Sequence, residues 1–242
     1  MFQRTNCLLL LLAIGGPVLA QAQGAEEEAK GPWFGNVKFG YLATSGNTDN
    51  SNLNTSFQLG YGAGKWVHTF DAFAIHATED EATTAESYEL GWKSERSLSE
   101  KDFLFGRLNW RNDRFSGYEE QFSQSVGYGR RLIDAAPHTL NAEIGAGARQ
   151  SERTDGLKEN DLILRGGLDY KWQFSETAAF TQDFVVESGE DNTYFESITA
   201  ITARLVGDLA LVASYTIKNN SVVPAGTDNT DTYTAISLEY KF

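Results

Sequence analysis

The sequence Ile236-Ser237-Leu238-Glu239-Tyr240-Lys241-Phe242 alternates apolar and polar side chains without a break. Successive side chains of a β-strand point to opposite faces, so this stretch predicts a strand with one apolar and one polar face. Bacterial outer-membrane barrels usually end in an aromatic residue on such a strand, and their assembly machinery reads that end. We therefore predict that Tyr240 and Phe242 form an assembly signal and that the barrel assembly machinery is a partner during biogenesis.

The same alternation recurs through the chain. It is clearest at 52–61, 140–149, 161–172 and 209–218. The remaining candidate strands run at 33–43, 66–77, 86–97, 102–112, 119–132, 177–187, 194–206 and 232–242. The segments 66–77 and 194–206 alternate poorly, and we expect a β-bulge that shifts the phase in each of them.

The alternation and the absence of long apolar runs together predict the fold class. After residue 22 the sequence holds no run of 18 apolar residues, which argues against helical membrane spans. Strands can cross a membrane only as a closed barrel, because every backbone polar group must be paired in lipid. Residues 33–242 accommodate about 12 strands of ~9–11 residues. We predict an all-β fold, a transmembrane antiparallel up-and-down β-barrel. The alternative is a soluble β-sandwich or lipocalin-like barrel, whose apolar face would form the core.

Connections between the predicted strands alternate in length, as outer-membrane barrels require. Short ones lie near 63–64, 98–99, 135–137, 175–176 and 207–208, and longer polar ones at 44–51, 78–85, 112–118, 150–159, 188–193 and 219–231. We expect the short set in the periplasm, together with both chain termini, and the long set outside the cell. Amphipathic aromatic rings favour headgroup depth, so the short-turn end is predicted to carry a girdle. Its members are Trp33, Tyr61, Trp66, Trp92, Trp172, Tyr240 and Phe242.

The first 22 residues predict a secretory signal peptide. They contain one basic residue, Arg4, and an apolar run from Leu8 to Ile14 that is too short to span a bilayer as a helix. Small residues follow, and we expect cleavage after Ala20 or Ala22.

Residues 23–32 include three consecutive glutamates and predict an acidic linker before a barrel at 33–242. Cys7, the single cysteine, leaves with the signal peptide, so the mature chain is expected to form no disulfide. Loss of Arg4 makes the mature chain one charge more negative than the −13 of the whole sequence. Such an excess argues against nucleic acid as a partner.

One block of the sequence resembles a known family. Its residues are Asp113, Arg114, Phe115, Gly117 and Tyr118, then Gly127, Tyr128 and Gly129, with an earlier Ser45-Gly46-Asn47-Thr48. Over about 33–242 the chain resembles the uncharacterised, salt-induced outer-membrane proteins of Gram-negative bacteria, a domain-of-unknown-function β-barrel family. The resemblance implies an outer-membrane barrel connected by name to salt stress. It implies no substrate and no catalytic residues.

The block at Asp113 has two interpretations. Asp113, Arg114 and Phe115 precede Ser116-Gly117, a dipeptide that marks a turn. The functional interpretation is a rim element that shapes the external mouth of the barrel. The simpler one is a turn with a local ion pair, which we favour because exposed ion pairs contribute little.

The polar face of the predicted strands carries charges of both signs in equal number. The candidates for the lumen are Lys38, Glu89, Lys93, Glu95, Arg107, Arg111, Glu143, Arg149, Asp161, Arg165, Asp169, Lys171, Asp183 and Glu187. A selective ion pore favours a ring of one sign. We expect ion pairs that cross and mostly close a narrow lumen, although a small aqueous passage is allowed at this strand number.

Four glycines, at positions 127, 129, 145 and 147, fall on the polar face of adjacent predicted strands. Glycine leaves room on its face of a sheet, so these positions either admit a bulky neighbour or let the barrel wall bend. We favour the bend.

No catalytic constellation is predicted. Nucleophilic catalysis needs a Ser or Cys with a base in reach. His138 falls in a predicted turn, and His68 and His76 are separated by about 27 Å along one strand. A hydrolase or lipid-modifying activity is kept as a second alternative.

The predicted external loops are acidic. Their acids are Asp49, Glu79, Asp80, Glu81, Asp155, Glu190, Asp191, Asp228 and Asp231. Carboxylate oxygens suit Ca²⁺ or Mg²⁺, but no loop has the spacing of a calcium motif. We predict no cofactor and no metal site, and expect at most loosely bound Ca²⁺ or Mg²⁺ that bridges these acids to lipopolysaccharide.

These observations predict a non-enzymatic outer-membrane protein that supports envelope integrity or permeability, with a role in salt or osmotic stress. The alternative is a narrow channel for small solutes or ions. The expected partners are outer-membrane lipid and lipopolysaccharide, and the oligomeric state is left open.

Overall fold

The computed structural model describes residues 31–44, 50–80, 82–113 and 116–242. The predicted signal peptide, its cleavage position and most of the acidic linker lie outside the described residues, as do Asp49, Glu81, Arg114 and Phe115. Within the described ranges no helix is long and apolar enough to cross a membrane.

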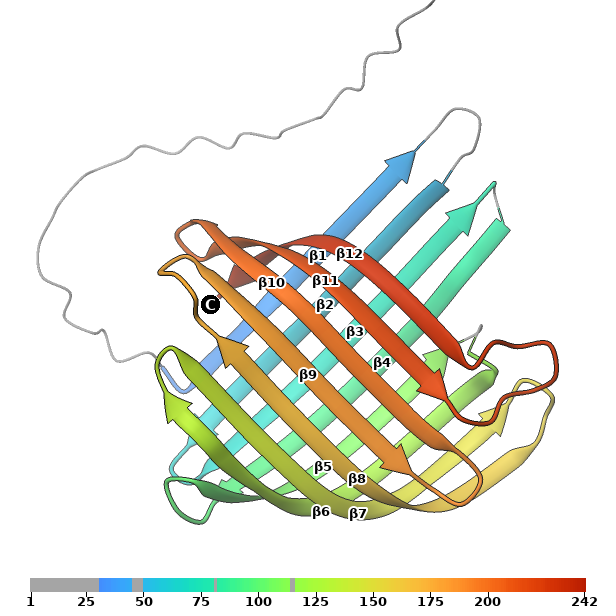
Figure 1. Cartoon of the computed structure of the whole chain (residues 1–242), viewed down its shortest axis with the longest axis horizontal. Coiled ribbons are helices and arrows are strands. Elements are labelled where there is room, and N and C mark those ends of the chain that lie inside the picture. Colours follow the sequence, from blue (N-terminus) through green and yellow to red (C-terminus); the bar gives the residue numbers. More distant parts are fainter. Residues whose placement is uncertain (1–30, 45–49, 81, 114–115) are drawn as a thin grey trace, which may run out of the picture. The chain divides into compact units, whose positions relative to one another are not determined.

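Twelve β-strands succeed one another along the described residues (Figure 1). They are β1 Trp33–Thr44, β2 Asn50–Ala63, β3 Trp66–Glu79, β4 Ala82–Ser97, β5 Asp102–Asp113, β6 Tyr118–Ala135, β7 His138–Arg153, β8 Lys158–Trp172, β9 Ala178–Ser188, β10 Thr193–Val206, β11 Leu209–Asn220 and β12 Thr230–Lys241. Each strand pairs antiparallel with its neighbours in the chain, and β1 pairs with β12, so the sheet closes. The predicted antiparallel up-and-down barrel of about 12 strands is confirmed.

The closed sheet turns its apolar face outward. On β8, Leu162 and Leu164 are 85% and 69% exposed, whereas Asp161 and Arg165 are only 5% and 3% exposed. The other strands repeat this pattern, with large exposed apolar side chains around the outer wall. Such an extensive apolar surface is not found on soluble monomers. The soluble alternative, in which the apolar face forms the core, is therefore wrong.

The barrel closes where the two ends of the described chain meet. Gly35 and Phe242 exchange two backbone hydrogen bonds, of 3.0 and 3.1 Å, and the β1–β12 pairing continues from Asn36 to Phe39. The ring of Phe242 lies over Gly35, because a Cβ on Gly35 would come within 2.8 Å of the ring Cζ. Phe242 thus forms the last hydrogen-bonded residue pair between β12 and β1. Its role as an assembly signal stays a prediction.

The connections differ in length less regularly than predicted. The short set joins strands at one end, as expected, through residues 64–65, 98–101, 136–137, 173–177 and 207–208. At the other end, the loop predicted at 78–85 shrinks to 80–81, because β3 continues to Glu79 and β4 begins at Ala82. Polar residues continue the backbone pairing there, since a strand ladder does not need apolar side chains.

The predicted bulges do not explain the irregular strands. The register does shift, between Ala77 and Thr78 on β3 and between Arg204 and Val206 on β10, but both shifts lie near strand ends. The poor alternation has another cause, because apolar side chains also line the interior. Examples are Phe73 and Ile75 on β3, and Ile198 and Ala200 on β10.

Aromatic side chains gather at the short-turn end. Trp33 and Tyr61 pair across β1 and β2 with ring centroids 4.7 Å apart. His68 stacks on Trp66, with centroids 5.9 Å apart, and His138 stacks on Trp172, with centroids 6.0 Å apart. The girdle therefore includes two histidines in addition to the predicted residues.

Three of the four lumen-facing glycines lie against aromatic rings, as the alternative of a bulky neighbour predicts, whereas a Cβ on Gly147 would meet the backbone of Gln124 and Ser125. The bend of the wall stays a prediction. A Cβ on Gly127 would come within 2.6 Å of the Phe105 ring and 2.7 Å of Gly145 Cα, and a Cβ on Gly129 would overlap the Phe103 ring. Both rings are buried. The missing side chains on β6 and β7 therefore make room for two phenylalanines of β5.

Replacing Gly127 by Ala is expected to destabilise the barrel by about 1–3 kcal/mol, because the buried Phe105 ring has to move. Unfolding of the purified protein in urea and detergent would measure the loss. Gly106→Ala is the matched control, since a Cβ there meets nothing within 4 Å. Equal stability of the two variants would contradict the proposed packing.

Candidate functional site

The lumen is divided into two parts. One is a cavity of about 690 Å³, here called the vestibule, whose lining reaches Gln173, Thr177 and Gly207 at the short-turn end. Its inner end is lined by Arg111 and Arg165, among others. On the other side of Arg111 the lumen contains a second cavity of only about 10 Å³, which holds no more than one water molecule. The buried groups that fill this far part of the lumen are here called the closure layer.

A buried arginine stands at the centre of the closure layer. Arg149 of β7 is fully buried, and its Nη2 donates to Asp161 Oδ2 on β8 at 2.9 Å. The same guanidinium also donates to the backbone carbonyls of Glu187 and Asn192. A buried charge is tolerated only when it is paired and hydrogen-bonded, so this arginine fixes the 189–192 turn inside the barrel mouth.

A second carboxylate joins two more arginines. Glu187 of β9 accepts from Arg165 Nη1 at 2.7 Å and lies 3.5 Å from Arg111 Nη1. Ser123 Oγ donates to the same carboxylate at 3.3 Å. The Arg111 guanidinium lies over the Tyr194 ring, 4.0 Å from its centroid, which is favourable cation–π geometry. These contacts connect β5, β6, β8, β9 and β10 across the lumen.

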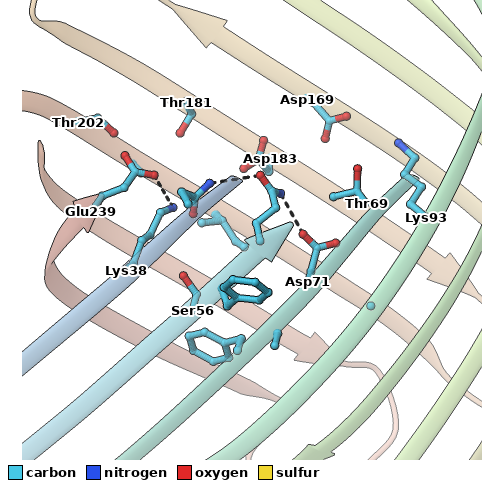
Figure 2. A pocket seen from close by; sticks show the side chains of 18 of the residues that line it. Lys38, Ser56, Thr69, Asp71, Lys93, Asp169, Thr181, Asp183, Thr202 and Glu239 are labelled. Carbon is cyan, nitrogen blue, oxygen red and sulfur yellow. Dashed lines mark hydrogen bonds and ion pairs between the residues drawn. The ribbon is translucent and has the colours of Figure 1, made fainter. Parts of the chain in front are cut away.

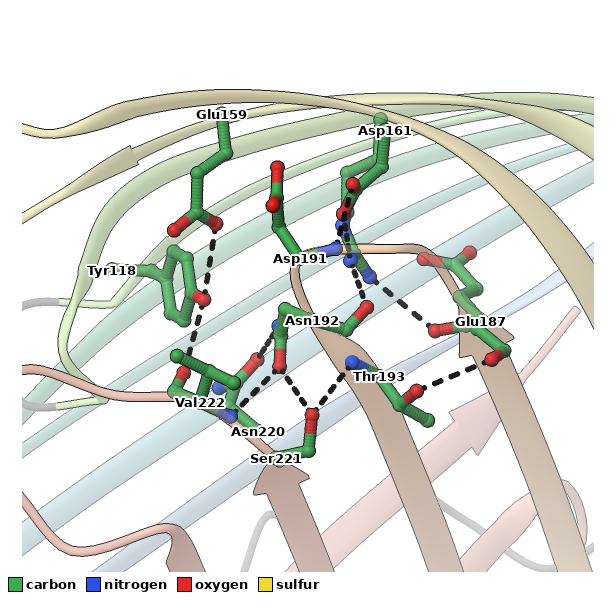
Figure 3. A network of polar contacts seen from close by, with 12 residues as sticks. Tyr118, Glu159, Asp161, Glu187, Asp191, Asn192, Thr193, Asn220, Ser221 and Val222 are labelled. Atoms are coloured by element: carbon green, nitrogen blue, oxygen red, sulfur yellow. Dashed lines mark hydrogen bonds and ion pairs between the residues drawn. The ribbon is translucent and has the colours of Figure 1, made fainter.

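Asparagines join the two loops that cover this layer (Figure 3). Asn192 Nδ2 donates to Asn220 Oδ1 at 2.8 Å, and Asn192 Oδ1 accepts from Val222 N and Ser221 Oγ, each at 3.2 Å. The Thr193 backbone N–H donates to Ser221 Oγ at 2.8 Å. The 189–192 turn and the 221–229 loop are therefore held together by polar side chains, and Asn192 is their shared partner.

The block at Asp113 forms the other side of this closure. The Tyr118 side chain is 1% exposed, and its hydroxyl lies 3.0 Å from the Val222 carbonyl oxygen and 3.3 Å from Glu159 Oε2 (Figure 3). Gly117 has φ of 83°, and a Cβ there would come within 2.7 Å of Pro224. The block therefore packs beneath the 221–229 loop.

The local ion pair expected in this block involves Arg114, which lies outside the described residues, so it stays a prediction. Asp113 is buried, and Tyr233 Oη donates to its Oδ2 at 3.4 Å. Ser116 Oγ donates to the Asp113 carbonyl oxygen at 3.2 Å. Alternation marks Asp113 as inward, but nothing in the sequence shows that a loop after β11 covers it.

Further ion pairs cross the vestibule. Lys93 of β4 pairs with Glu143 of β7, and Lys218 of β11 pairs with Glu89 of β4. Lys93 also lies 2.7 Å from Glu95 Oε1. These pairs join strands that are not neighbours in the sheet, which alternation alone does not specify.

The vestibule wall carries shorter-range contacts as well (Figure 2). Lys38 lies 3.8 Å from Glu239 Oε1, and Gln58 Nε2 donates to Asp71 Oδ1 at 2.9 Å. Lys218, Glu196, Glu239 and Asp71 are charged lumen residues absent from the predicted set, although each obeys the same alternation.

Lys171 lines the vestibule without an ion pair to a described acid, and three further predicted lumen residues also lack an ion pair within the described part of the chain. Asp169 and Asp183 face each other in register across β8 and β9 and make no ion pair there. Arg107 donates to the neutral Asn109 Oδ1 at 2.8 Å and forms no ion pair with a described carboxylate. All three line the vestibule.

The described residues include all three histidines and most of the acidic side chains. No group of three or more His, Cys, Asp or Glu side chains there is placed to hold a metal ion. His68 Nδ1 lies 3.0 Å from Ser94 Oγ, and His138 Nδ1 lies 2.9 Å from Tyr170 Oη. Both histidines belong to the aromatic girdle, away from the lumen.

Comparisons with known proteins agree with this geometry. The model of the family "Protein of unknown function, DUF481" matches residues 37–242. "Uncharacterized protein YdiY" of Escherichia coli (strain K12) is 32% identical over 213 residues, which cover 88% of this chain and 84% of that protein.

Solved structures of barrel proteins were compared with the chain, and their sequence identity to it is low. The NanC porin has a TM-score of 0.50 at 12% identity, covering 86% of this chain and 97% of its own. The translocator domain of autotransporter NalP from Neisseria meningitidis has a TM-score of 0.47 at 11% identity, covering 87% and 88%.

Replacing Tyr118 by Phe is expected to loosen the 221–229 loop, because the hydroxyl that reaches Val222 is lost. Backbone amide exchange of residues 222–227, followed by mass spectrometry, should become faster. Tyr215→Phe is the control, since Tyr215 points outward from β11 and is 44% exposed. Unchanged exchange in the Tyr118 variant would show that this contact does not hold the loop.

Proposed function

The chain belongs to the family "Protein of unknown function, DUF481", and from that premise we propose that it is a non-enzymatic outer-membrane barrel with a closed lumen, which supports the envelope as a permeability barrier under salt or osmotic stress. The observation that carries the proposal is the closure layer. Buried pairs such as Arg149–Asp161 and Arg165–Glu187 fill the lumen, and two loops cover them.

An outer-membrane location is supported by the outer wall. The exposed apolar side chains form a surface suited to lipid, and the aromatic girdle suits headgroup depth at the short-turn end. Trp33 and Phe242, the first and last residues of the barrel sequence, both lie at the short-turn end. If the short turns lie in the periplasm, the first and last residues of the barrel also lie there, and the closure layer faces the outside of the cell.

Closure is supported by the energetics of the paired charges. An ion that crosses the closure layer has to separate groups such as Arg111 of β5 and Glu187 of β9, which are both buried. Breaking one partner of a buried pair typically costs about 3–5 kcal/mol, because it leaves an uncompensated charge. The resting barrel should therefore conduct poorly.

A second candidate is a narrow channel that opens when the loops move. The observation in its favour is the vestibule, which extends about 690 Å³ inward from the short turns. The closure layer is then a gate, whose opening requires the 221–229 loop to leave Asn192 and Tyr118.

Recordings in planar lipid bilayers should show no steady conductance for the wild-type protein. Asn192→Ala should produce intermittent opening, because it removes the shared partner of the two loops. Asn160→Ala is the control, because Asn160 is an exposed asparagine of β8 near the same end. A large, steady wild-type conductance would contradict a closed lumen.

The physiological part of the proposal is tested with a deletion strain. Loss of growth at high salt with unchanged uptake of small solutes, restored by the wild-type gene, is the expected result. Reduced solute uptake at ordinary salt would instead favour the channel.

A further inference from the structure

The inner end of the vestibule holds an arginine, Arg107, that makes no ion pair with a described carboxylate. Arg107, Arg111 and Arg165 line this region and lie within electrostatic range of one another. Glu187 is shared by Arg111 and Arg165. Arg107 is left with the neutral Asn109 as its hydrogen-bond partner.

Two of the other nearby acids are already engaged, whereas Asp169 lies within electrostatic range of Arg107 without forming an ion pair with it. Glu89 pairs with Lys218, and Glu196 accepts a hydrogen bond from Tyr194 Oη at 2.7 Å. The Nε of Arg165 is buried and has no hydrogen-bond partner among the described residues, although its Nη1 binds Glu187. Arg107 therefore keeps spare donors at the inner end of the cavity, whereas the Nε of Arg165 is too buried for a ligand to reach. Spare guanidinium donors favour a carboxylate, with which they form strong charge-assisted hydrogen bonds.

Neutral hydroxyl groups line the same cavity. Ser56, Thr69, Thr181 and Thr202 point into it from β2, β3, β9 and β10 (Figure 2). None of the four hydroxyls makes a hydrogen bond to another described residue. They are free to exchange hydrogen bonds with a ligand that carries hydroxyl groups of its own.

We propose that the vestibule is a binding site for a singly charged, polyhydroxylated carboxylate of the sugar-acid type, with the carboxylate on Arg107 and the hydroxyls on the serine and threonine side chains. A volume of about 690 Å³ lies in the ordinary range of small-molecule sites. The ligand enters from the short-turn end, because the closure layer fills the other end.

The charge of the ligand is limited by two acids. Asp169 and Asp183 face each other in the same cavity, so a second negative charge on the ligand would be repelled. Arg107 is the arginine of the lining that is left to bind the ligand's carboxylate. The inference goes beyond the proposed barrier function, and binding can be measured whether or not the barrel conducts.

The proposal is tested by isothermal titration calorimetry, which measures the affinity of the purified full-length barrel in detergent for sodium gluconate. Sorbitol is the matched control ligand, because it differs from gluconate only in having a CH₂OH group in place of the carboxylate. Gluconate should bind and sorbitol should not. Arg107→Gln should weaken gluconate binding about tenfold or more, because a charge-assisted contact is lost.

Two further variants separate recognition from folding. Arg107→Lys keeps the charge and should retain part of the affinity, and Arg130→Gln alters an exposed arginine of β6 and should bind like wild type. Heat-modifiable mobility on gels checks that each barrel is folded. The proposal is overturned if gluconate does not bind, if sorbitol binds equally well, or if folded Arg107→Gln binds gluconate as tightly as the wild type.

Discussion

The pairing of β1 with β12 is the constraint on which the rest of this structure depends. Once that seam forms, every strand has two neighbours and the sheet has no free edge. Closure also creates an inside and an outside, so the alternation along each strand becomes a separation of chemistry. Apolar side chains such as Leu162 face outward, and Arg165 and its partners face inward. Gly35 and Phe242 complete the seam with backbone hydrogen bonds.

Inside the barrel, charge pairing and loop packing divide the lumen unequally. At the long-loop end, Arg149, Glu187 and Asn192 gather strands and loops into a dense polar layer. At the short-turn end the charges stand farther apart and leave the vestibule between them. The sequence block around Asp113 and Tyr118 belongs to the dense layer. Its glycine and tyrosine are explained by contact with the loop after β11.

Much of the fold follows from the sequence, because local rules govern it. Alternation alone places Arg149 and Asp161 inside the barrel and Leu164 outside it. This assignment does not require knowledge of the strand register or of the loop conformations. The pairing of Lys218 with Glu89 is different, because it depends on which strands face each other across the closed barrel. Likewise, Tyr118 meets Val222 only after a loop distant in sequence folds inward. Register, tilt and loop conformation decide such contacts, and they are not local properties.

The central claim is that lipid touches the apolar side of each strand while the interior is polar. Single cysteines at successive β8 positions, each carrying a nitroxide label in lipid bilayers, test it most directly. Leu162, Leu164 and Leu168 should collide strongly with oxygen dissolved in lipid, whereas Asp161 and Arg165 should not. Contradiction would come from a profile without this two-residue period, or from one in which the leucine positions are shielded from lipid.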